Sequence, residues 1–448
     1  MDFEKICVLG LGYTGLPTAC TFATHGLQVV GVDTNPVVVE TLRNGGLHIF
    51  EPGLRTLAQA AIGSGSLVIS ENLQPADAFI IEVPTPFYDD KRADMRAVTS
   101  AAEAIVPHLQ KGNLVVLEST SPPMTTLNLL APILEKSGLR AGFDFYLAYS
   151  PERVMPGQIL REIIENDRVI GGINMASAEA GRALYEIFVR GEIVLTDSTT
   201  AEMVKLMENT YRDVNIALAN EFSHLAEQFG IDIWQAIRIA NRHPRVNILS
   251  PGPGVGGHCI SVDPWFLVEA SPDKTPLIRT ARLVNDLQPA HVVNMIEMVV
   301  VKSGLDSKSA LQGVRIGLLG LAYKADVDDL RESPAIAIAR LLIRAGADVL
   351  AYEPNRLYAS LVGIRTVPSL DEVLAEAEIV VLLVDHTSLK NLDPAKTAAM
   401  TNARVLVDCV NGWSRQEWQG AGFELHKIGD GGFLRMAHHV SAEQGDVQ

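Results

Sequence analysis

The sequence predicts an α/β protein in which two doubly wound domains are joined by a helical middle domain. Short apolar runs alternate with helix-like segments at both ends of the chain, which is typical of parallel sheets with crossover helices. Each end also begins with an apolar run that enters a glycine turn, at residues 8–12 and again at 318–322. Between the two ends lie long stretches with helical apolar spacing.

The N-terminal part, residues 1–198, is predicted to form the first domain around a mostly parallel sheet. Its expected strands are short apolar runs, as strands buried on both faces are. They cover residues 6–9, 29–33, 79–83, 114–117, 145–149 and 169–172.

The middle part, residues 199–305, is predicted to be a helical domain. Apolar residues recur at helical spacing over 200–229, where Gly230 can end the helix, and again over 275–303. A long helix that is apolar on several sides is more often buried than solvated. We therefore expect this part to connect the two α/β domains and to form the interface of a homodimer.

The C-terminal part, residues 306–448, is predicted to form the second α/β domain. Its first expected strand runs into the glycine turn at Gly320, and a helix can begin at Ser333 because Pro334 suits the first helical turn. The expected strands cover residues 315–320, 347–352, 379–384 and 405–408.

Composition restricts the classes of function. The chain has 37 Lys and Arg against 53 Asp and Glu, a net charge of −16, which argues against a nucleic-acid binder. Its 4 cysteines lie far apart, a usage that suits a reducing cytosol. No apolar run approaches the roughly 20 residues that span a bilayer, and Asp2 and Glu4 argue against a signal peptide. We expect a cytoplasmic enzyme with no membrane partner.

The glycine turn Gly10-Leu11-Gly12-Tyr13-Thr14-Gly15 fits the G-x-G-x-x-G pattern of dinucleotide sites. It follows a strand, opens a helix, and has Asp33 at the end of the next strand, 18 residues after Gly15. Gly10 permits the tight turn, Gly12 lets the backbone approach a pyrophosphate, and Gly15 lets the helix pack on the strand.

Asp33 favours NAD as the cofactor, because its charge would repel the 2′-phosphate of NADP while its oxygens accept from ribose hydroxyls. Because a glycine turn follows the first expected strand of each α/β domain, both domains are expected to be Rossmann-like. Thr85 follows the strand that ends at Val83, which suits a cofactor contact, and Tyr13 and Thr14 belong to the same expected site. A Rossmann-like half without a cofactor is the alternative interpretation.

A second loop carries the expected nucleophile. Four glycines within residues 252–257 precede Cys259, and glycine allows a ligand close to the backbone. A cysteine beside a nicotinamide indicates aldehyde chemistry: the thiolate adds to the aldehyde, a hydride leaves, and the thioester is hydrolysed. Asp263 lies one helical turn further on. The alternative is a tight turn with a buried structural thiol. We expect no metal, because no His or Cys cluster accompanies His258.

A polar stripe is expected on the first helix of the middle part. Its members, spaced three, four and three residues apart, are Glu202, Lys205, Asn209 and Arg212. The lysine could stabilise an oxyanion, and the asparagine could hold a water that relays a proton. A solvated helix face is the alternative interpretation of this spacing.

These segments together resemble the nucleotide-sugar 6-dehydrogenase family, the UDP-glucose/GDP-mannose dehydrogenases. The likeness extends from Ile6 to about Gly412. Its markers are the glycine turn with Asp33 and the motifs at 118–120, 150–152, 201–209, 256–259, 320–324 and 329–334. The resemblance implies an N-terminal NAD domain, a helical dimer-forming middle, and a C-terminal domain that helps to bind a UDP-sugar.

The resemblance also implies a role for each matching residue. Cys259 would be the nucleophile, with Lys205 and Asn209 assisting proton transfer and oxyanion stabilisation and Asp263 nearby. Glu152 would help water to attack the thioester, and Thr120 would contact the cofactor or that water. The implied substrate contacts are Lys205, Asn209, Gly256, Tyr323 and Lys324, and the implied further cofactor contact is Arg331.

Two segments depart from the pattern of UDP-glucose dehydrogenases and resemble the branch of the family that acts on UDP-N-acetylhexosamines. Residues 153–157 stand where UDP-glucose dehydrogenases tend to carry Phe-Leu, and the run 241–247 is also distinctive. The implied contacts to the sugar or its phosphates are Arg153, Val154, Arg212, His243 and Arg245. Loop or subunit-interface packing is the alternative for His243 and Arg245.

The branch resembled most is the one that oxidises UDP-N-acetyl-D-mannosamine at C6 to the uronate with two NAD⁺. Oxidation of UDP-N-acetylglucosamine or UDP-glucose is the alternative within the family. A nucleotide-sugar epimerase and an NAD-sensing binding protein are the alternatives from other classes. An epimerase would normally use a Tyr-x-x-x-Lys pair after a Rossmann strand, which the sequence does not place there, and a sensor would need neither Cys259 nor Lys205.

Overall fold

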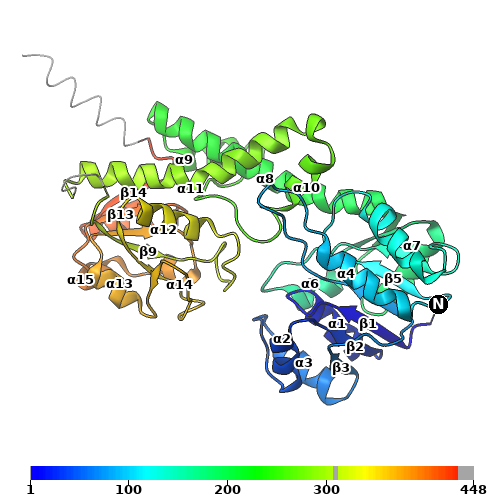
Figure 1. The fold of residues 1–448 in the computed structure, drawn as a ribbon. Coiled ribbons are helices and arrows are strands. Elements are labelled where there is room, and N and C mark those ends of the chain that lie inside the picture. Colours follow the sequence, from blue (N-terminus) through cyan, green and yellow to red (C-terminus); the bar gives the residue numbers. More distant parts are fainter. Residues whose placement is uncertain (1, 306–310, 432–448) are drawn as a thin grey trace, which may run out of the picture. The chain divides into compact units, whose positions relative to one another are not determined.

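The computed structural model describes residues 2–305 and 311–431 (Figure 1). Its contacts divide the chain into two compact units. The first consists of Met1–Asn209 with Trp265–Thr275, and the second of Thr210–Pro264 with Pro276–Gln448. In the described part, strands form one sheet of eight in the first unit and one of six in the second. This confirms the α/β class and the two sheets expected from the sequence.

The sheet of the first unit has the strand order β3-β2-β1-β4-β5-β6-β7-β8. Its first six strands follow the order of dinucleotide-binding Rossmann sheets. All neighbours are parallel except β6 and β7, so the sheet is mostly parallel, as expected. Its strands are β1 Lys5–Leu9, β2 Gln28–Val32, β3 Leu67–Ser70, β4 Ala78–Ile81, β5 Leu114–Leu117, β6 Tyr146–Tyr149, β7 Arg168–Gly172 and β8 Ile193–Asp197.

Helices cover both faces of this sheet. On β1, Ile6 and Val8 face one apolar cluster while Cys7 and Leu9 face the other, as alternation along a strand requires. The first cluster includes α1 Gly15–Thr24, α3 Leu54–Gly63, α6 Ile159–Glu165 and α7 Met175–Tyr185. The second includes α4 Arg96–Ile105, the π-helical turn Thr126–Leu130 and α5 Ala131–Leu134; α2 Pro36–Arg43 follows β2. The sheet is therefore doubly wound.

The sheet of the second unit repeats this topology. Its order is β11-β10-β9-β12-β13-β14, with parallel pairing throughout. The strands are β9 Arg315–Leu319, β10 Asp348–Tyr352, β11 Arg365–Thr366, β12 Ile379–Leu382, β13 Val405–Asp408 and β14 Glu424–Lys427. The helices after β9 are α12 Pro334–Arg344, α13 Leu370–Glu376, α14 Thr387–Lys390, α15 Pro394–Met400 and α16 Arg415–Gly420. The second sheet is thus also Rossmann-like.

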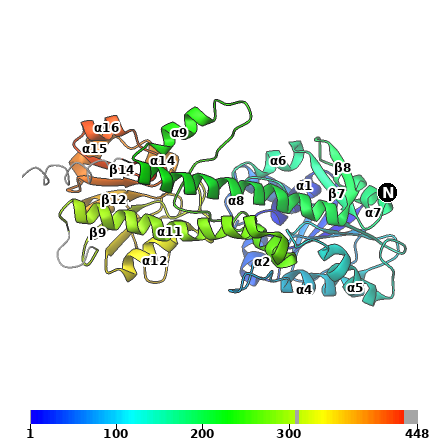
Figure 2. The same cartoon turned by 90° about the horizontal axis from the view of Figure 1, so that it is seen from above.

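Two long helices and two short ones form the helical middle. They are α8 Ser198–Phe229, α9 Ile233–Ala240, α10 Asp263–Ala270 and α11 Pro276–Lys302. In the second unit α8 and α11 run side by side (Figure 2), joined by a buried ion pair between Arg282 and Asp213 and by Asn285, which donates to Asp213. Both long helices match the segments that the apolar spacing predicts, within two residues at each end.

Several elements were not predicted. Strands β3, β8, β11 and β14 and helix α9 escaped the apolar patterns. Strand β8 shows why: its apolar run is only Ile193-Val194-Leu195, which is shorter than the roughly four to eight residues that indicate a buried strand. Among the described residues, no helix combines the length and the apolar character needed to cross a membrane.

Candidate active site

The glycine turn after β1 has the geometry that the motif predicts. Gly10 has φ +96°, and its N–H donates to the carbonyl of Val32 at 2.8 Å. A Cβ on Gly15 would lie 2.0 Å from the carbonyl oxygen of Gly10, so only glycine fits there. The third glycine is therefore required by the turn itself as well as by helix packing.

The middle glycine faces open space. A Cβ on Gly12 would meet nothing within 4 Å, which leaves room for a phosphate at the start of α1. Asp33, at the end of β2, accepts from the Leu11 N–H at 2.9 Å with one carboxylate oxygen. Its other oxygen accepts from the Asn35 N–H at 2.8 Å. The turn and the acidic residue are thus tied together, and their geometry fits a dinucleotide.

Two other predicted cofactor residues, and one that was not predicted, lie around this turn. Thr14 donates its hydroxyl proton to Glu82, which follows β4. Thr85 is buried three residues further along the chain. His48 was missed by sequence reasoning: its Nε2 donates to the carbonyl of Leu11 at 2.9 Å, since a carbonyl can only accept. A lone histidine in a loop carried no motif that could have indicated this contact.

The structure brings together two residues that the resemblance assigned to catalysis. Lys205, on α8, donates from Nζ to the backbone carbonyl of Glu152 at 2.6 Å. Glu152 accepts from the Arg153 N–H at 2.7 Å, which orients its carboxylate. Asn209 is buried one turn further along α8, and Thr120 is half-buried after β5. Glu152 and Lys205 therefore form a preorganised pair in the first unit.

Glu152 also belongs to a cluster of buried charges that sequence reasoning did not predict. Arg168, the first residue of β7, donates to Glu118 and to Glu152, both at 2.9 Å. Its guanidinium lies 4.1 Å from the centre of the Tyr185 ring, and the Tyr185 hydroxyl donates to Glu118. Burial raises the pKa of Glu152, and the positive charge of Arg168 opposes that rise.

Glu82 completes the cluster. Burial raises the pKa of its carboxyl well above the ordinary value, and the neighbouring Glu118 raises it further. The sequence held a signal for this contact between Glu82 and Glu118. Each directly follows a buried strand, β4 or β5, and the carboxyl ends of parallel strands share one edge of a sheet.

The polar stripe on α8 is solvated only at its end, where Arg212 is exposed. Glu202 and Asn209 are buried, whereas Met203 and Met207 are exposed. The carboxylate of Glu202 accepts from the N–H groups of Met124 and Thr126, at 2.6 and 2.7 Å, and so caps the start of the π-helical turn. Its place in the stripe is explained by this structural role.

Cys259 is the exposed cysteine, whereas Cys7, Cys20 and Cys409 are buried. This excludes the alternative of a buried structural thiol. The carbonyl of Cys259 accepts from the N–H of Asp263 at 2.8 Å, so the cysteine stands one helical turn before α10 and the buried Asp263 begins it.

Glycines bring the loop of residues 251–259 against residues 323–334 of the same unit. A Cβ on Gly257 would lie 2.7 Å from the Tyr323 ring, and one on Gly256 would lie 2.5 Å from the carbonyl oxygen of Glu332. The Gly257 N–H donates to the carbonyl of Arg331 at 3.2 Å. The predicted residues Gly256, Tyr323 and Arg331 thus meet. Burial raises the pKa of Tyr323 to about 12, and the nearby Asp329 and Cys259 contribute to the rise.

The remaining predicted residues lie in varied surroundings. Arg153 pairs with Glu208, with its guanidinium 2.6 Å from the carboxylate, and Val154 packs against the apolar cluster of the first unit. Lys324 lies 5.9 Å from the Tyr323 ring centre, and Arg212 is exposed on α8. Their expected contacts with the sugar or its phosphates stay predictions.

His243 and Arg245 stand on an exposed loop after α9. Asn241 closes this loop at its base: its side chain accepts from the Ile248 N–H at 2.7 Å and donates to the Ile248 carbonyl at 2.9 Å. The two hydrogen bonds of Asn241 therefore hold the base of the loop closed. The proposed contacts of His243 and Arg245 with the sugar or its phosphates stay predictions.

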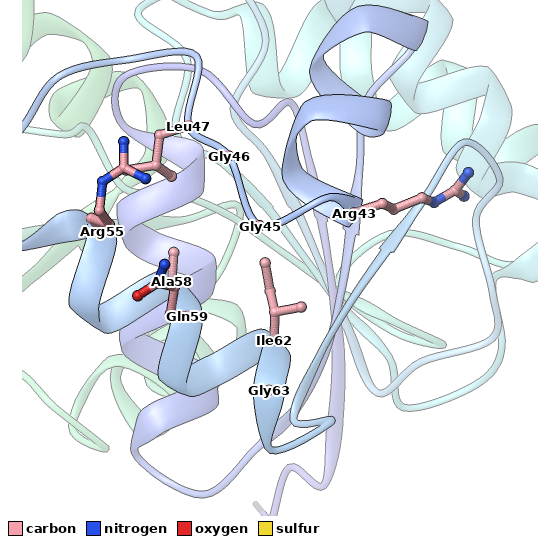
Figure 3. A pocket seen from close by; sticks show the side chains of 9 residues that line it. All are labelled: Arg43, Gly45, Gly46, Leu47, Arg55, Ala58, Gln59, Ile62 and Gly63. Atoms are coloured by element: carbon pink, nitrogen blue, oxygen red, sulfur yellow. The ribbon is translucent and has the colours of Figure 1, made fainter.

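A hollow of about 200 Å³ lies between α3 and the end of α2 with the loop that follows it. Arg43, Arg55, Gln59, glycines and apolar residues line it (Figure 3). None of the predicted site residues lines it, and the side chain of Arg43 points away from it. We assign it no function. The described residues contain no group of three or more His, Cys, Asp or Glu that could hold a metal ion.

Three sequence models of one family match the chain in order. They describe the NAD binding domain (residues 4–189), the central domain (199–287) and the UDP binding domain (317–415) of the UDP-glucose/GDP-mannose dehydrogenases. The chain belongs to the UDP-glucose/GDP-mannose dehydrogenase family. This confirms the resemblance and NAD as the cofactor, and the UDP binding domain supports a UDP-sugar as the substrate.

Relatives within the family are similar over nearly the whole chain. A UDP-N-acetyl-D-mannosamine dehydrogenase of Methanococcus maripaludis is 45% identical over 96% of this chain and 98% of its own. An NDP-N-acetyl-D-galactosaminuronic acid dehydrogenase of Ralstonia solanacearum is 46% identical over 92% and 97%. The structure of UDP-D-ManNAc dehydrogenase from Pyrococcus horikoshii is 39% identical, covers 96% of this chain and 100% of its own, and has a TM-score of 0.88.

Proposed function

We propose that this dehydrogenase oxidises UDP-N-acetyl-D-mannosamine at C6 to UDP-N-acetyl-D-mannosaminuronate. The alcohol, two NAD⁺ and one water yield the carboxylate, two NADH and three protons. Family membership and the relatives that carry this name support the reaction. The observation that carries the covalent mechanism is Cys259, the exposed thiol in a loop of glycines. We also propose that the enzyme works in the cytoplasm, which the usage of its four cysteines supports.

Residues of the first unit would hold NAD, which when bound accepts a hydride at its nicotinamide ring. Gly12 and the start of α1 would receive the pyrophosphate, and Asp33 the adenosine ribose. Tyr13, Thr14 and Thr85 would contact the dinucleotide nearby. Arg331 is proposed as a further cofactor contact.

In the proposed mechanism Cys259 attacks the aldehyde formed by the first oxidation, because a thiolate is a strong nucleophile. The resulting thiohemiacetal loses the second hydride and becomes a thioester, which water can hydrolyse. Lys205 stabilises the negative charge that develops on the C6 oxygen, and Asn209 holds the water that relays its proton. Glu152 accepts a proton from the water that cleaves the thioester. Thr120 and Asp263 assist as neighbours of the cofactor or water and of the nucleophile, respectively.

The residues proposed to hold the UDP-sugar are those that the resemblance implies. They are Lys205, Asn209, Gly256, Tyr323 and Lys324, joined by Arg153, Val154, Arg212, His243 and Arg245 at the sugar or its phosphates. Arginines and lysines suit this role because they pair with phosphate oxygens.

The substrate assignment is tested by counting NADH and acid on a panel of UDP-sugars. We expect two NADH per acid from UDP-N-acetyl-D-mannosamine, and little turnover of UDP-N-acetylglucosamine, UDP-N-acetylgalactosamine or UDP-glucose. Preference for another member would keep the chemistry and correct the sugar; the galactosamine sugar is included because of the Ralstonia relative. Failure of all four would reject the proposed function.

We also propose that the enzyme is a homodimer formed through the helical middle. An apolar stripe on α8, made of Tyr211, Leu218, Leu225 and Phe229, is 40% to 68% exposed. Its members are spaced seven, seven and four residues apart, the repeat with which one helix packs along another. A second copy of the chain, with the same stripe, is the proposed partner.

The double change Leu218→Glu and Leu225→Glu is expected to shift the enzyme toward monomer at micromolar concentration, because it places charges within the apolar stripe. Sedimentation equilibrium measures this shift. Val362→Glu is the matched control, since Val362 is 93% exposed and lies outside the helical middle. A wild-type protein that sediments as a monomer would refute the dimer.

A further inference from the structure

The charged cluster beneath the glycine turn contains two buried carboxylate oxygens that face no donor. Oε1 of Glu82 accepts from Thr14, and Oε1 of Glu118 accepts from Arg168 and Tyr185. The other oxygen of each carboxyl, Oε2, is buried and has no donor within the described residues. Buried polar atoms are rarely left in this state.

The two carboxyls follow neighbouring strands at paired positions, because Ile81 lies beside Leu117 in the parallel pairing of β4 and β5. The nearby Glu118 is also among the causes that raise the pKa of Glu82. Two ionised carboxylates side by side are both acceptors and repel each other, so a proton between them relieves the pair. The backbone brings the pair together: Glu82 and Glu118 each follow a buried strand, and the Glu118 N–H donates to the carbonyl of Ile81 at 3.0 Å. A Cβ on Gly15 would lie 3.2 Å from Cγ of Glu82, so Glu82 fills the space under the turn.

Arg168 links this pair to Glu152. One nitrogen of its guanidinium, Nη2, lies 2.9 Å from an oxygen of Glu118 and 2.9 Å from an oxygen of Glu152. The Nε of Arg168 donates to the hydroxyl of Ser150 at 3.1 Å. Its side chain is only 5% exposed, so the charge is screened little by water. The bridge therefore sets both the position of Glu152 and the charge that Glu152 experiences.

We propose that Glu82 and Glu118 share one proton, and that this pair, through Arg168, positions Glu152 and holds it as the ionised base of thioester hydrolysis. Arg168 and Glu118 are positioning residues, and Glu82 is the neutral member of the pair. If both Glu82 and Glu118 were ionised, Arg168 would face three carboxylates and Glu152 would be harder to ionise. The role assigned to Glu152 rests on the proposed function, whereas the shared proton does not.

The shared proton is tested on the apoenzyme by infrared spectroscopy. At neutral pH, the difference spectrum between wild type and Glu82→Gln is expected to contain the carbonyl band of a protonated carboxyl. Glutamine preserves the contacts, since its amide can donate to Glu118 and accept from Thr14. The exposed Glu103, which pairs with Lys136, supplies the control Glu103→Gln, whose difference spectrum should contain only carboxylate bands. A carboxylate band alone for Glu82→Gln would overturn the shared proton.

The positioning role is tested by the pH dependence of acid release, followed by chemical quench after the thioester has formed. The rate falls below the pKa of the base, so the acid limb reports that pKa. The titratable and charged groups that face Glu152 are Arg168 from β7, Glu118 after β5, Lys205 from α8 and Glu82 after β4. Replacing one of these charged groups by a neutral one should move the acid limb, and the sign of the removed charge determines the direction.

Arg168→Met removes a positive neighbour, so the acid limb should move to higher pH by about one to three units. Glu118→Gln removes a negative neighbour, so the limb should move to lower pH, by about one unit. Glu82→Gln should leave it in place, because a neutral group replaces a neutral group. Limbs of Arg168→Met and Glu118→Gln that coincide with wild type would overturn the positioning role, and a downward shift in Glu82→Gln would overturn the neutral state of Glu82.

Removing a buried charge can prevent folding, so each variant is first checked by circular dichroism and thermal melting. Should Arg168→Met not fold, the downward shift in Glu118→Gln decides the positioning role alone. A wild-type enzyme that forms no acid from any UDP-sugar would reject the proposed function, while the infrared result would still decide the shared proton. The two failures are thus distinguishable.

Discussion

Replacing Cys259 by serine should lower uronate formation by at least about a thousandfold, because the thiolate that forms the thioester is lost. A serine hydroxyl ionises far less readily than a thiol, so it is a much weaker nucleophile. Binding of NAD and of the UDP-sugar should persist, since neither depends on the sulfur. Uronate is measured by chromatography and binding by calorimetry. Unchanged acid production in this variant would refute covalent catalysis.

The same residue gives an independent readout in the absence of substrate. Cys259 is exposed and the other three cysteines are buried, so a thiol reagent should label one site per chain rapidly in wild type and none in Cys259→Ser. Cys20→Ala is the matched control, because Cys20 is buried in the apolar cluster of the first unit and takes no part in the proposed chemistry. It should keep both the rapid labelling and acid production.

Lys205→Met should lower kcat by about a hundred- to a thousandfold, the usual effect of removing one group that stabilises an oxyanion. Methionine keeps most of the aliphatic length but lacks the charge, and it cannot donate to the carbonyl of Glu152, which accepts from Lys205 at 2.6 Å. Steady-state kinetics with the sugar and NAD varied separately measure the loss.

The control for Lys205 is Lys136→Met, which removes an exposed lysine that pairs with Glu103 on the surface of the same unit. Its kcat should equal that of wild type. If Lys205→Met raised KM for the sugar without lowering kcat, Lys205 would be a binding residue and its proposed part in catalysis would be wrong.

Local patterns predicted the fold and the outline of the candidate site. The glycine turn could be read because Gly10 needs a positive φ and Gly15 leaves no room for a Cβ, requirements that lie within a few residues. Apolar periodicity predicted α8 and α11 because a helix or a buried strand imposes its own repeat on the sequence. Strand β8 was missed because its apolar run, Ile193-Val194-Leu195, is too short to show such a repeat.

The sequence by itself therefore determined the two sheets and the turn with Asp33. It also indicated Cys259, Lys205 and Glu152 as candidate site residues. Only the tertiary structure decided which thiol is exposed, that Glu202 caps a turn 76 residues away, and that Arg168 joins Glu118 to Glu152. The contacts of Glu202 and of Arg168 join residues that are distant along the chain. Arg168, Glu118 and Glu152 meet because strand ends are brought to one edge of the sheet. A buried charge needs a partner, but no local pattern says which distant residue supplies it, because that depends on strand order and register.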